Sequence, residues 1–470
     1  MRRQLMSIKD RTQSDRHDPE MMNFDTLKAR GLFDERLPRY TSYPPAPAFT
    51  KDIGPAFQAE ALRALDPDAP ISLYLHIPFC ERLCWFCACR TQGVRSLSPV
   101  QAYLETLRKE LALIASHQPR KLRLKQMHWG GGTPTILPPT LIGEVSDMLG
   151  DVFVMDDDTT FSVEIDPTLV DADKIAALKK AGMTRASIGV QDFAPQVQKC
   201  IGRLQSYEQT FDAVNMLRDA QVASLNVDLV YGLPFQSTEG FAQTLQQVNE
   251  LRPDRVALFG YAHVPHMAKR QNLIPEAALP GDRARFALFN KATEVLCADG
   301  MVPIGIDHFA RPDDSMAKAA TDGTLRRNFQ GYTVDGCDTL LGLGASSISR
   351  FKEGFVQNAA QTGDYTRQIN AGELAAVRGY RLTPEDRLRS RIIEMLMCDF
   401  AIDFNELSLN EVEYASILPA LDALRQECEG MIYETSERLS LTPQARPLVR
   451  RLAHFFDASN PEHAGYSRVS

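Results

Sequence analysis

Three cysteines on one short segment, Cys80, Cys84 and Cys87, have the spacing C-x3-C-x2-C and directly follow an apolar run, residues 71–77, that predicts a strand. Three thiolates on one tight loop can hold three irons of a four-iron, four-sulfur cube. The fourth iron then has no cysteine ligand, and an open coordination position lets a bound metal take part in chemistry. The spacing therefore predicts a catalytic iron–sulfur site.

Other uses of cysteine agree less well with this spacing. Zinc sites usually pair two C-x2-C knuckles, and no second pair follows here. Disulfide frameworks belong to short secreted chains, whereas this chain has 470 residues, nine cysteines and no secretory signal. Five of the remaining cysteines are scattered, and we expect buried or free thiols at Cys200, Cys297, Cys337, Cys398 and Cys428.

The composition is that of an ordinary globular protein with more than one folding unit, because single cores stop growing near ~250–300 residues. Hydrophobic residues make up 44% of the chain and charged residues 24%, with a net charge of −8. This acidic balance argues against nucleic-acid binding, which usually needs a basic face. No apolar run approaches the ~18 residues that cross a bilayer, so we expect no membrane span and a cytoplasmic location.

Strand-like and helix-like segments alternate from residue 71 onward. Six apolar runs separated by amphipathic stretches imply βα units and a parallel sheet, either an open doubly wound sheet or a curved partial barrel. One helix is expected to begin with Ser98 as its N-cap and Pro99 after it, and another to run from Asp171 to Ala181 before Gly182. The expected strands are residues 71–77, 126–129, 161–165, 185–190, 225–231 and 256–261.

Polar and glycine residues follow these strands at the carboxyl ends, where active residues of parallel sheets lie. Any one of these residues could simply cap the helix that follows its strand. Several polar residues at one edge of the sheet are better explained by a ligand site. After the cysteine loop come the glycine-rich run 130–135, Glu164 and Asp166, Gln191, Asp228, and Ala262 with His263.

The cysteine spacing resembles the signature of the radical S-adenosylmethionine (SAM) superfamily. In those enzymes the amino and carboxylate groups of SAM bind the open iron, and an electron from the cluster splits SAM into methionine and a 5′-deoxyadenosyl radical. Gly131 and Gly132 lack a Cβ, so a ligand can approach the backbone there. Glu164, Gln191 and Asp228 have groups that suit an ammonium or ribose hydroxyls. Phe86 could stack on adenine or be an ordinary core aromatic.

Seven motifs narrow the resemblance to the oxygen-independent coproporphyrinogen III oxidases. The likeness runs from about residue 35 to the terminal residues 466–468. One departure is Ala88, where relatives often have glycine, and the extra methyl is expected to change little. The motifs are RYTSYP (39–44), HIPFCERLCWFCAC (76–89), HWGGGTPT (128–135), GVQDF (189–193), DLVYGLP (228–234), DHFARP (307–312) and RNFQGYT (327–333).

This resemblance implies an α/β fold: an incomplete (β/α)6 radical SAM barrel with an N-terminal extension and a small, mostly helical, winged-helix-like C-terminal domain. We place a polar tail and an active-site segment in residues 1–52, the barrel with its extension in 53–370 and the C-terminal domain in 371–470. In the last part, helices are expected to start near Thr383-Pro384 and Thr442-Pro443, with a short strand at 430–433 between them. The acidic charge favours a cap over the barrel mouth rather than a DNA-binding domain.

The same resemblance implies two SAM molecules beside a [4Fe-4S] cluster held by the three cysteines. Contacts of the first SAM map to Tyr74, Gly131, Glu164 and Ile348. Contacts of the second map to Phe86, Gly132, Thr133, Gln191, Arg203, Asp228 and Ala262. Cys89, two residues after Cys87, is expected not to be a ligand, since the two would have to reach different irons across one residue.

The implied reaction converts the propionates on rings A and B of coproporphyrinogen III to vinyl groups, giving protoporphyrinogen IX in haem biosynthesis. The deoxyadenosyl radical would take a hydrogen from the propionate carbon next to the ring, and carbon dioxide and one electron would leave. The substrate carries four carboxylates and needs local cations. Candidate substrate or catalytic residues are Arg39, Cys89, His308, Arg311 and Gln330. An electron donor such as flavodoxin or ferredoxin is also implied, and we expect a monomer.

Two alternatives remain. One is the related haem chaperone, a binding protein on the same barrel. Those relatives usually have phenylalanine in place of Cys89 and lack the long N-terminal segment, so both features favour the oxidase. The other is a plain electron carrier, against which stand the missing fourth ligand, the length of the chain and the polar edge of the sheet.

Overall fold

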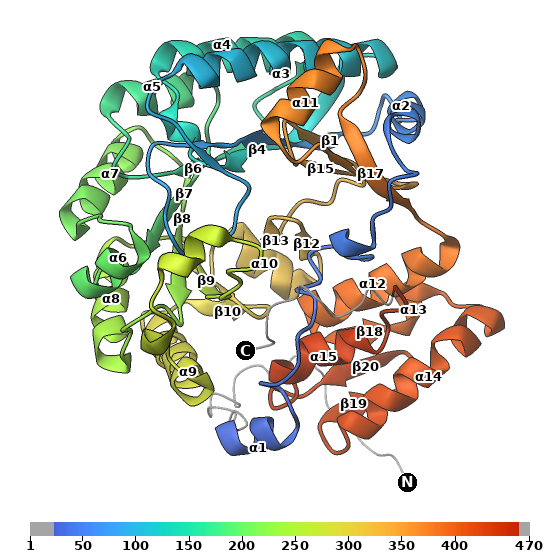
Figure 1. Ribbon diagram of the computed structural model, residues 1–470. Helices are drawn as coiled ribbons and strands as arrows, with labels where there is room; N and C mark the ends of the chain where they lie inside the picture. The colour runs from blue at the N-terminus through green and yellow to red at the C-terminus, as the bar shows by residue number, and fades with distance from the viewer. Residues whose placement is uncertain (1–22, 460–470) are drawn as a thin grey trace.

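The computed structural model describes residues 23–459, which contain one thirteen-stranded mixed sheet with helices packed around it (Figure 1). Residues 1–22, nearly all of the expected polar tail, and residues 460–470, with the motif at 466–468, lie outside the described part. No helix within residues 23–459 is long and apolar enough to span a bilayer.

Six parallel strands form the centre of the sheet, and each of them coincides with a predicted strand. They are β1 (Ile71–Ile77), β4 (Leu122–Gly131), β6 (Thr160–Ile165), β7 (Arg185–Gln191), β8 (Ser224–Tyr231) and β9 (Arg255–Gly260). Their order in the sheet is β9-β8-β7-β6-β4-β1, with all neighbours parallel. The predicted succession of βα units is therefore confirmed, although β4 is longer than expected.

Helices connect these strands and cover one face of the sheet (Figure 1). They are α3 (Ser98–His117), α4 (Pro139–Val152), α5 (Ala172–Lys180), α6 (Pro195–Ile201), α7 (Tyr207–Asp219), α8 (Thr238–Glu250) and α9 (Asp282–Ala298). Asp171 caps α5 by accepting a hydrogen bond from the Lys174 N–H at 2.8 Å, as its position predicts. The prediction of Ser98 as an N-cap was wrong by one residue, because Leu97 holds that position and Ser98 is already helical.

Alternate residues of the parallel strands face opposite sides of the sheet, and this separates the core from the site. In β6, Phe161, Val163 and Ile165 are buried in the main hydrophobic core beside the helices. Ser162 and Glu164, between them, face the other side and line a cavity. Since the side-chain period of a strand is two, each strand contributes polar groups to one face only.

Both ends of the parallel section continue as strands that were not predicted. β14 (Leu340–Leu343) pairs with β1 in parallel, and β15 (Ile348–Phe351), β16 (Gly354–Asn358) and β17 (Ala376–Arg381) follow as antiparallel neighbours. At the other end, β11 (His308–Ala310) pairs with β9 antiparallel, and β10 (Val302–Ile304) pairs with β11 antiparallel. The sheet is therefore mixed. The short β5 (Phe153–Val154), beside β4, and the hairpin of β12 (Arg326–Asn328) and β13 (Gly331–Thr333) are further strands.

Beyond β17 the chain becomes mainly helical. Its elements are α12 (Pro384–Asp399), β18 (Ala401–Asp403), α13 (Phe404–Leu407), α14 (Glu411–Glu427), β19 (Ile432–Glu434), β20 (Arg438–Leu441) and α15 (Val449–His454). Thr383 and Asp386 form a capping box at the start of α12, which confirms the predicted helix start. The helix expected near Thr442-Pro443 begins later, as a short 3-10 turn followed by α15.

The N-terminal segment shares a hydrophobic core with this C-terminal part. Phe24, on α1 (Phe24–Ala29), and Tyr43 pack in one cluster with residues of α12, α14 and α15. The buried Arg450 on α15 donates hydrogen bonds to the carbonyls of Leu37 and Pro38. The chain then passes α2 (Pro55–Arg63) before entering β1. The remaining helices are α10 (Ser315–Asp322) and α11 (Thr362–Asn370).

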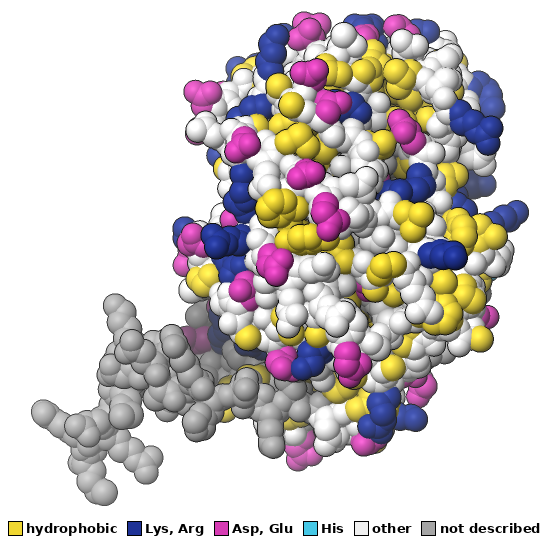
Figure 2. All heavy atoms as spheres, turned by 90° about the vertical axis from the view of Figure 1, so that its left-hand side faces the viewer, with side chains coloured by type: hydrophobic (Ala, Val, Ile, Leu, Met, Phe, Trp, Pro, Cys, Tyr) yellow, Lys and Arg dark blue, Asp and Glu magenta, His cyan; other side chains and the backbone are white. Residues whose placement is uncertain are grey.

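Charged side chains of both signs are intermixed with hydrophobic ones on the face shown in Figure 2, which views the molecule from the left side of Figure 1. Helices α5 to α8 lie on this side (Figure 1). Among the described residues drawn there, neither charge sign covers a broad area of this face.

Candidate functional site

The cysteine loop leaves β1 and folds back on itself. The two-residue strands β2 (Phe79–Cys80) and β3 (Gln92–Gly93) pair in parallel, and the Val94 N–H donates to the Cys80 carbonyl at 3.0 Å. This closes the segment that carries Cys80, Cys84 and Cys87. All three side chains line one cavity of about 480 Å³ at the carboxyl edge of the sheet, which we call the cysteine cavity.

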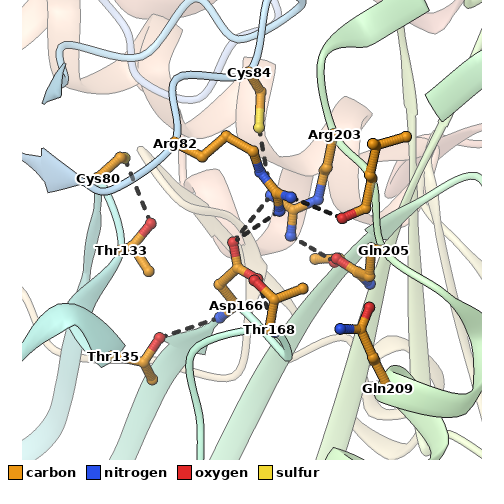
Figure 3. Close-up of polar contacts among 12 residues, drawn as sticks. Cys80, Arg82, Cys84, Thr133, Thr135, Asp166, Thr168, Arg203, Gln205 and Gln209 are labelled. Atoms are coloured by element: carbon orange, nitrogen blue, oxygen red, sulfur yellow. Dashed lines mark hydrogen bonds and ion pairs between the residues drawn. The ribbon is translucent and has the colours of Figure 1, made fainter. Parts of the chain in front are cut away.

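Hydrogen-bond donors and positive charge lie close to two of the three sulfurs (Figure 3). The Thr133 hydroxyl is 3.4 Å from Cys80 Sγ, and Nη1 of Arg203 is 3.5 Å from Cys84 Sγ. Burial raises the pKa of the Cys80 thiol to about 11. The pKa of Cys87 is lowered, mainly because the neighbouring Cys89 thiol donates a hydrogen bond to its sulfur.

The three thiols and the hydrogen-bond donors beside them are of the kinds that an iron–sulfur cube takes. Within residues 23–459, no three His, Cys, Asp or Glu side chains come close enough together to hold one metal ion. A cube spreads its irons over several corners, so its cysteines need not converge on one point. Hydrogen bonds to the sulfurs are among the interactions that set cluster potentials. Cys80, Cys84 and Cys87 therefore suit the group that their spacing predicts.

The glycine-rich run after β4 packs directly against the cysteine loop. A Cβ on Gly132 would lie 2.6 Å from the Phe79 carbonyl oxygen, and one on Gly130 would lie 2.5 Å from Oε1 of Glu164. Gly131 has φ +103° and faces the His76 ring. Close contacts within the protein therefore require glycine at these positions even without a ligand. The sequence alone had suggested only that a ligand approaches the backbone here.

The four residues assigned to the first SAM lie around a second cavity of about 510 Å³, which we call the sheet cavity. Tyr74 and Ile348 line it, and Gly131 and Glu164 line both cavities. The Gly131 N–H donates to Oε2 of Glu164 at 3.1 Å, and Nε2 of His128 lies 3.3 Å from Oε1. Glu164 is thereby held between the two cavities.

All seven residues assigned to the second SAM line the cysteine cavity: Phe86, Gly132, Thr133, Gln191, Arg203, Asp228 and Ala262. Ser187 and Asn226 donate hydrogen bonds to the Asp228 carboxylate at 3.0 and 2.7 Å. Burial, followed by the charge of Glu164, raises the pKa of Asp228 to about 6. Gln191 ends β7 with φ +69°, a conformation that non-glycine residues adopt rarely and that often marks functional sites.

Two residues that sequence reasoning missed fasten the cysteine loop to the segment after β9. Nε2 of the fully buried Gln271 donates to the carbonyls of Phe86 (2.8 Å) and Ala262 (3.1 Å). Arg270 donates to the Thr91 hydroxyl at 3.0 Å and lines the cysteine cavity. Both lie in a short 3-10 turn, Lys269–Leu273, whose sequence has no motif that could have indicated this role.

Four of the five candidate substrate or catalytic residues lie at these cavities. Arg39 lines the cysteine cavity, His308 and Gln330 line the sheet cavity, and Cys89 lines both. Nη2 of Arg39 donates to the Gly260 carbonyl at 3.0 Å, which brings the N-terminal segment to the end of β9.

Arg311 is not brought to either cavity, contrary to expectation. It is ion-paired with Asp299 at 2.5 Å, and its N–H donates to the Asp254 carbonyl before the start of β9. Because β11 runs antiparallel to β9, each residue after His308 lies nearer the amino ends of the parallel strands. Arg311 thus stabilises the opposite edge of the sheet.

His308 is instead fixed inside the molecule by its neighbour. Nδ1 of His308 lies 2.7 Å from Oδ1 of Asp307. Burial by itself would raise the pKa of Asp307, but His308, Arg327 and Arg39 together lower it to about 2. Asp307 is therefore a stable anion that orients His308 at the sheet cavity.

Comparisons with known proteins agree with this geometry. Residues 74–248 match the model of the Radical SAM superfamily. The oxygen-independent coproporphyrinogen III oxidase of Cereibacter sphaeroides is 52% identical over 452 residues, covering 96% of this chain and 100% of the relative. The oxygen-independent coproporphyrinogen III oxidase of Salmonella typhimurium is 39% identical, and the match covers 90% of this chain and 92% of the relative. The solved coproporphyrinogen III oxidase of Escherichia coli, a radical SAM enzyme, has 36% identity and a TM-score of 0.85, covering 90% of this chain and 100% of that one. From this similarity over nearly the full length of both chains, the protein belongs to the oxygen-independent coproporphyrinogen III oxidase family of the radical SAM superfamily.

Proposed function

We propose that this protein converts coproporphyrinogen III to protoporphyrinogen IX without oxygen, by decarboxylating two propionates to vinyl groups. The observation that carries this proposal is the meeting of three cluster-type cysteines with Glu164 and Asp228 at two adjoining cavities. Volumes of about 480 and 510 Å³ lie in the range of small-molecule sites.

Cys80, Cys84 and Cys87 would hold the [4Fe-4S] cluster, and Thr133 and Arg203 would offset the charge on its sulfurs. With SAM bound, the cluster supplies the electron that generates the 5′-deoxyadenosyl radical. The protein's own task is to orient the reactants and exclude water.

Two SAM molecules per turnover are part of the proposal, since two carboxylates react. Glu164 has the charge to bind the ammonium of the first SAM, and its contacts with Gly131 and His128 fix its orientation. Asp228 and Gln191 have the acceptors and donors for the ribose hydroxyls of the second. Arg203 suits the methionine carboxylate, because guanidinium groups bind carboxylates strongly.

The finer architecture is proposed as well. β1 pairs with β4 and β14, and β9 pairs with β8 and β11, which supports an incomplete (β/α)6 barrel rather than a closed one. The separate C-terminal core, with helices around the small sheet of β18, β20 and β19, supports a winged-helix-like domain in the last part of the chain. Its proposed start at residue 371 precedes β17, which pairs with the main sheet. Residues 1–52 would form the N-terminal extension that carries Arg39 to the site, and residues 53–370 the barrel.

We further propose a cytoplasmic monomer that receives electrons from a small carrier such as flavodoxin or ferredoxin. The reaction removes one electron with each carbon dioxide, so an electron acceptor is also needed.

The rival function is that of a haem chaperone. The test is anaerobic incubation of the reconstituted protein with SAM, a reductant and coproporphyrinogen III, beside a haem titration of the same preparation. We expect vinyl product, with the tripropionate intermediate appearing first. Stoichiometric haem binding without any decarboxylation would support the chaperone instead.

A further inference from the structure

Two arginines at or beside the sheet cavity have no carboxylate partner: Arg90 lines the cavity, and Arg378 contacts Gln357, which lines it. Arg90 directly follows Cys89 on the cysteine loop, and Arg378 lies on β17. Neither side chain forms an ion pair with any residue in the described part of the chain, 23–459. Guanidinium groups that have no counter-ion can bind a carboxylate through parallel hydrogen bonds.

The Arg378 side chain is held beside the sheet cavity by a specific contact. Its Nε donates to Oε1 of Gln357 at 2.7 Å, and Gln357 lines the sheet cavity. Gln357 in turn donates to the Ser346 carbonyl at 3.1 Å. Arg378 also lies over the Phe49 ring, 5.9 Å from its centroid. These contacts use one face and one nitrogen of the guanidinium, and no other described residue is shown to bind its two terminal nitrogens.

Arg90 lies in the same region. Its carbonyl lies 3.1 Å from Nε2 of His76, which fixes the backbone, and the residue lines both the sheet cavity and an adjacent hollow of about 470 Å³. Burial, and next the charge of Arg90, lowers the pKa of Arg378, so the two guanidiniums are near enough to repel each other. A bound carboxylate would remove this repulsion.

A third arginine, also on β17, does have an acidic partner. Arg381 is ion-paired with Glu60 at 3.1 Å and lies over the Phe57 ring. Arg381 therefore has the partners that Arg378 lacks, although both belong to β17.

We propose that Arg90 and Arg378 together bind one of the two propionates of the tetrapyrrole that do not react. This inference rests on the proposed function, which supplies a substrate with four carboxylates. Arg39 lies at the end of β9, on the far side of the strand order from β16 and β17. Cations on both sides of the opening would hold the two retained propionates.

The test is anaerobic equilibrium binding of coproporphyrin III, the fluorescent oxidised form of the substrate, to reconstituted protein. Arg90→Gln and Arg378→Gln should each weaken binding about tenfold, the effect of losing one charge-assisted hydrogen bond. Arg378→Lys should restore part of the affinity, and the matched control Arg381→Gln should bind like the wild type. Iron content and thermal unfolding of each variant establish that the protein is folded.

A second probe identifies which propionate is bound. Deuteroporphyrin IX carries only the two propionates that the product retains, and we expect its binding to weaken by the same factor. Unchanged coproporphyrin binding in the double variant would overturn the proposal, as would a loss confined to coproporphyrin, which would assign the arginines to a reacting propionate. Unchanged porphyrin binding with weaker binding of reduced flavodoxin would also overturn it and mark the surface as a donor-docking site. Turnover of coproporphyrinogen III by the wild type tests the proposed function separately.

Discussion

Nη1 of Arg203 lies 3.5 Å from Sγ of Cys84, so a residue expected to bind the second SAM also contacts a cluster cysteine. The same guanidinium donates to the Gly189 carbonyl at 2.9 Å and lies 3.5 Å from Asp166 (Figure 3). One buried cation therefore joins the cluster loop to the ends of β6 and β7.

Replacing this cation should change the cluster electronically. Arg203→Gln should make the reduction potential more negative by roughly 60 mV, because a positive charge beside a ligand sulfur favours the reduced cluster and about 1.4 kcal/mol corresponds to 59 mV for one electron. A redox titration followed by electron paramagnetic resonance measures this shift. Arg82→Gln is the control, since Arg82 is also 3.6 Å from Asp166 but has no described contact with a cysteine sulfur. Equal shifts in both variants would contradict a specific effect of Arg203.

Removal of any one of Cys80, Cys84 or Cys87 should abolish the cluster. Each alanine variant should lose the brown colour, most of the about four irons per chain and all turnover, because each thiolate holds a different iron. Iron analysis and visible absorption check this. Cys297→Ala, at an exposed cysteine on α9, should keep both iron and activity. A triple variant that still formed protoporphyrinogen would refute the cluster assignment.

Cys89 should behave differently from the three ligands. Its thiol donates a hydrogen bond to Cys87 and lines both cavities, but one residue between them is too short a span for two irons. Cys89→Ser should therefore retain full iron content and the spectroscopic change on adding SAM, while turnover falls. Loss of a quarter or more of the iron, with no SAM effect in the wild type, would make Cys89 a ligand and the open-iron argument wrong.

Asp228→Asn should stabilise the protein while impairing turnover. The pKa of Asp228 is raised to about 6 in the folded state, so folded protein binds more protons than unfolded protein between about pH 4 and 6. The free energy of unfolding therefore falls as pH rises through this range. Removing the charge with Asp228→Asn should raise the free energy of unfolding by about 1–3 kcal/mol at pH 7 and change it little near pH 4.

Urea unfolding of the cluster-free protein at both pH values measures this difference. Asp212→Asn, at an exposed carboxylate on α7, is the control and should change little at either pH. Equal free energies of unfolding for Asp228→Asn and the wild type at pH 7 would show that burying the charged Asp228 carboxylate does not destabilise the folded protein. Iron content should match the wild type in the reconstituted variant.

The parallel strands could be predicted because each is an apolar run between amphipathic helices, and their polar ends mark the site. The antiparallel strands β15 and β16 escaped prediction because no helix separates them from β14 or from each other, so they lack the alternation of strand and helix. Arg311 was misassigned for a related reason, since a motif does not reveal that β11 reverses direction after His308. Gln271 could not be found at all, because its contacts with Phe86 and Ala262 depend on tertiary structure alone.

The most direct test of the account follows one hydrogen atom. Coproporphyrinogen III deuterated at the propionate carbons next to rings A and B should be converted anaerobically by the reconstituted protein with SAM. The account predicts two molecules of 5′-deoxyadenosine for each protoporphyrinogen IX, and one deuterium in each nucleoside, by mass spectrometry. Vinyl product accompanied by deuterium-free 5′-deoxyadenosine would contradict hydrogen abstraction from the propionate by the SAM-derived radical.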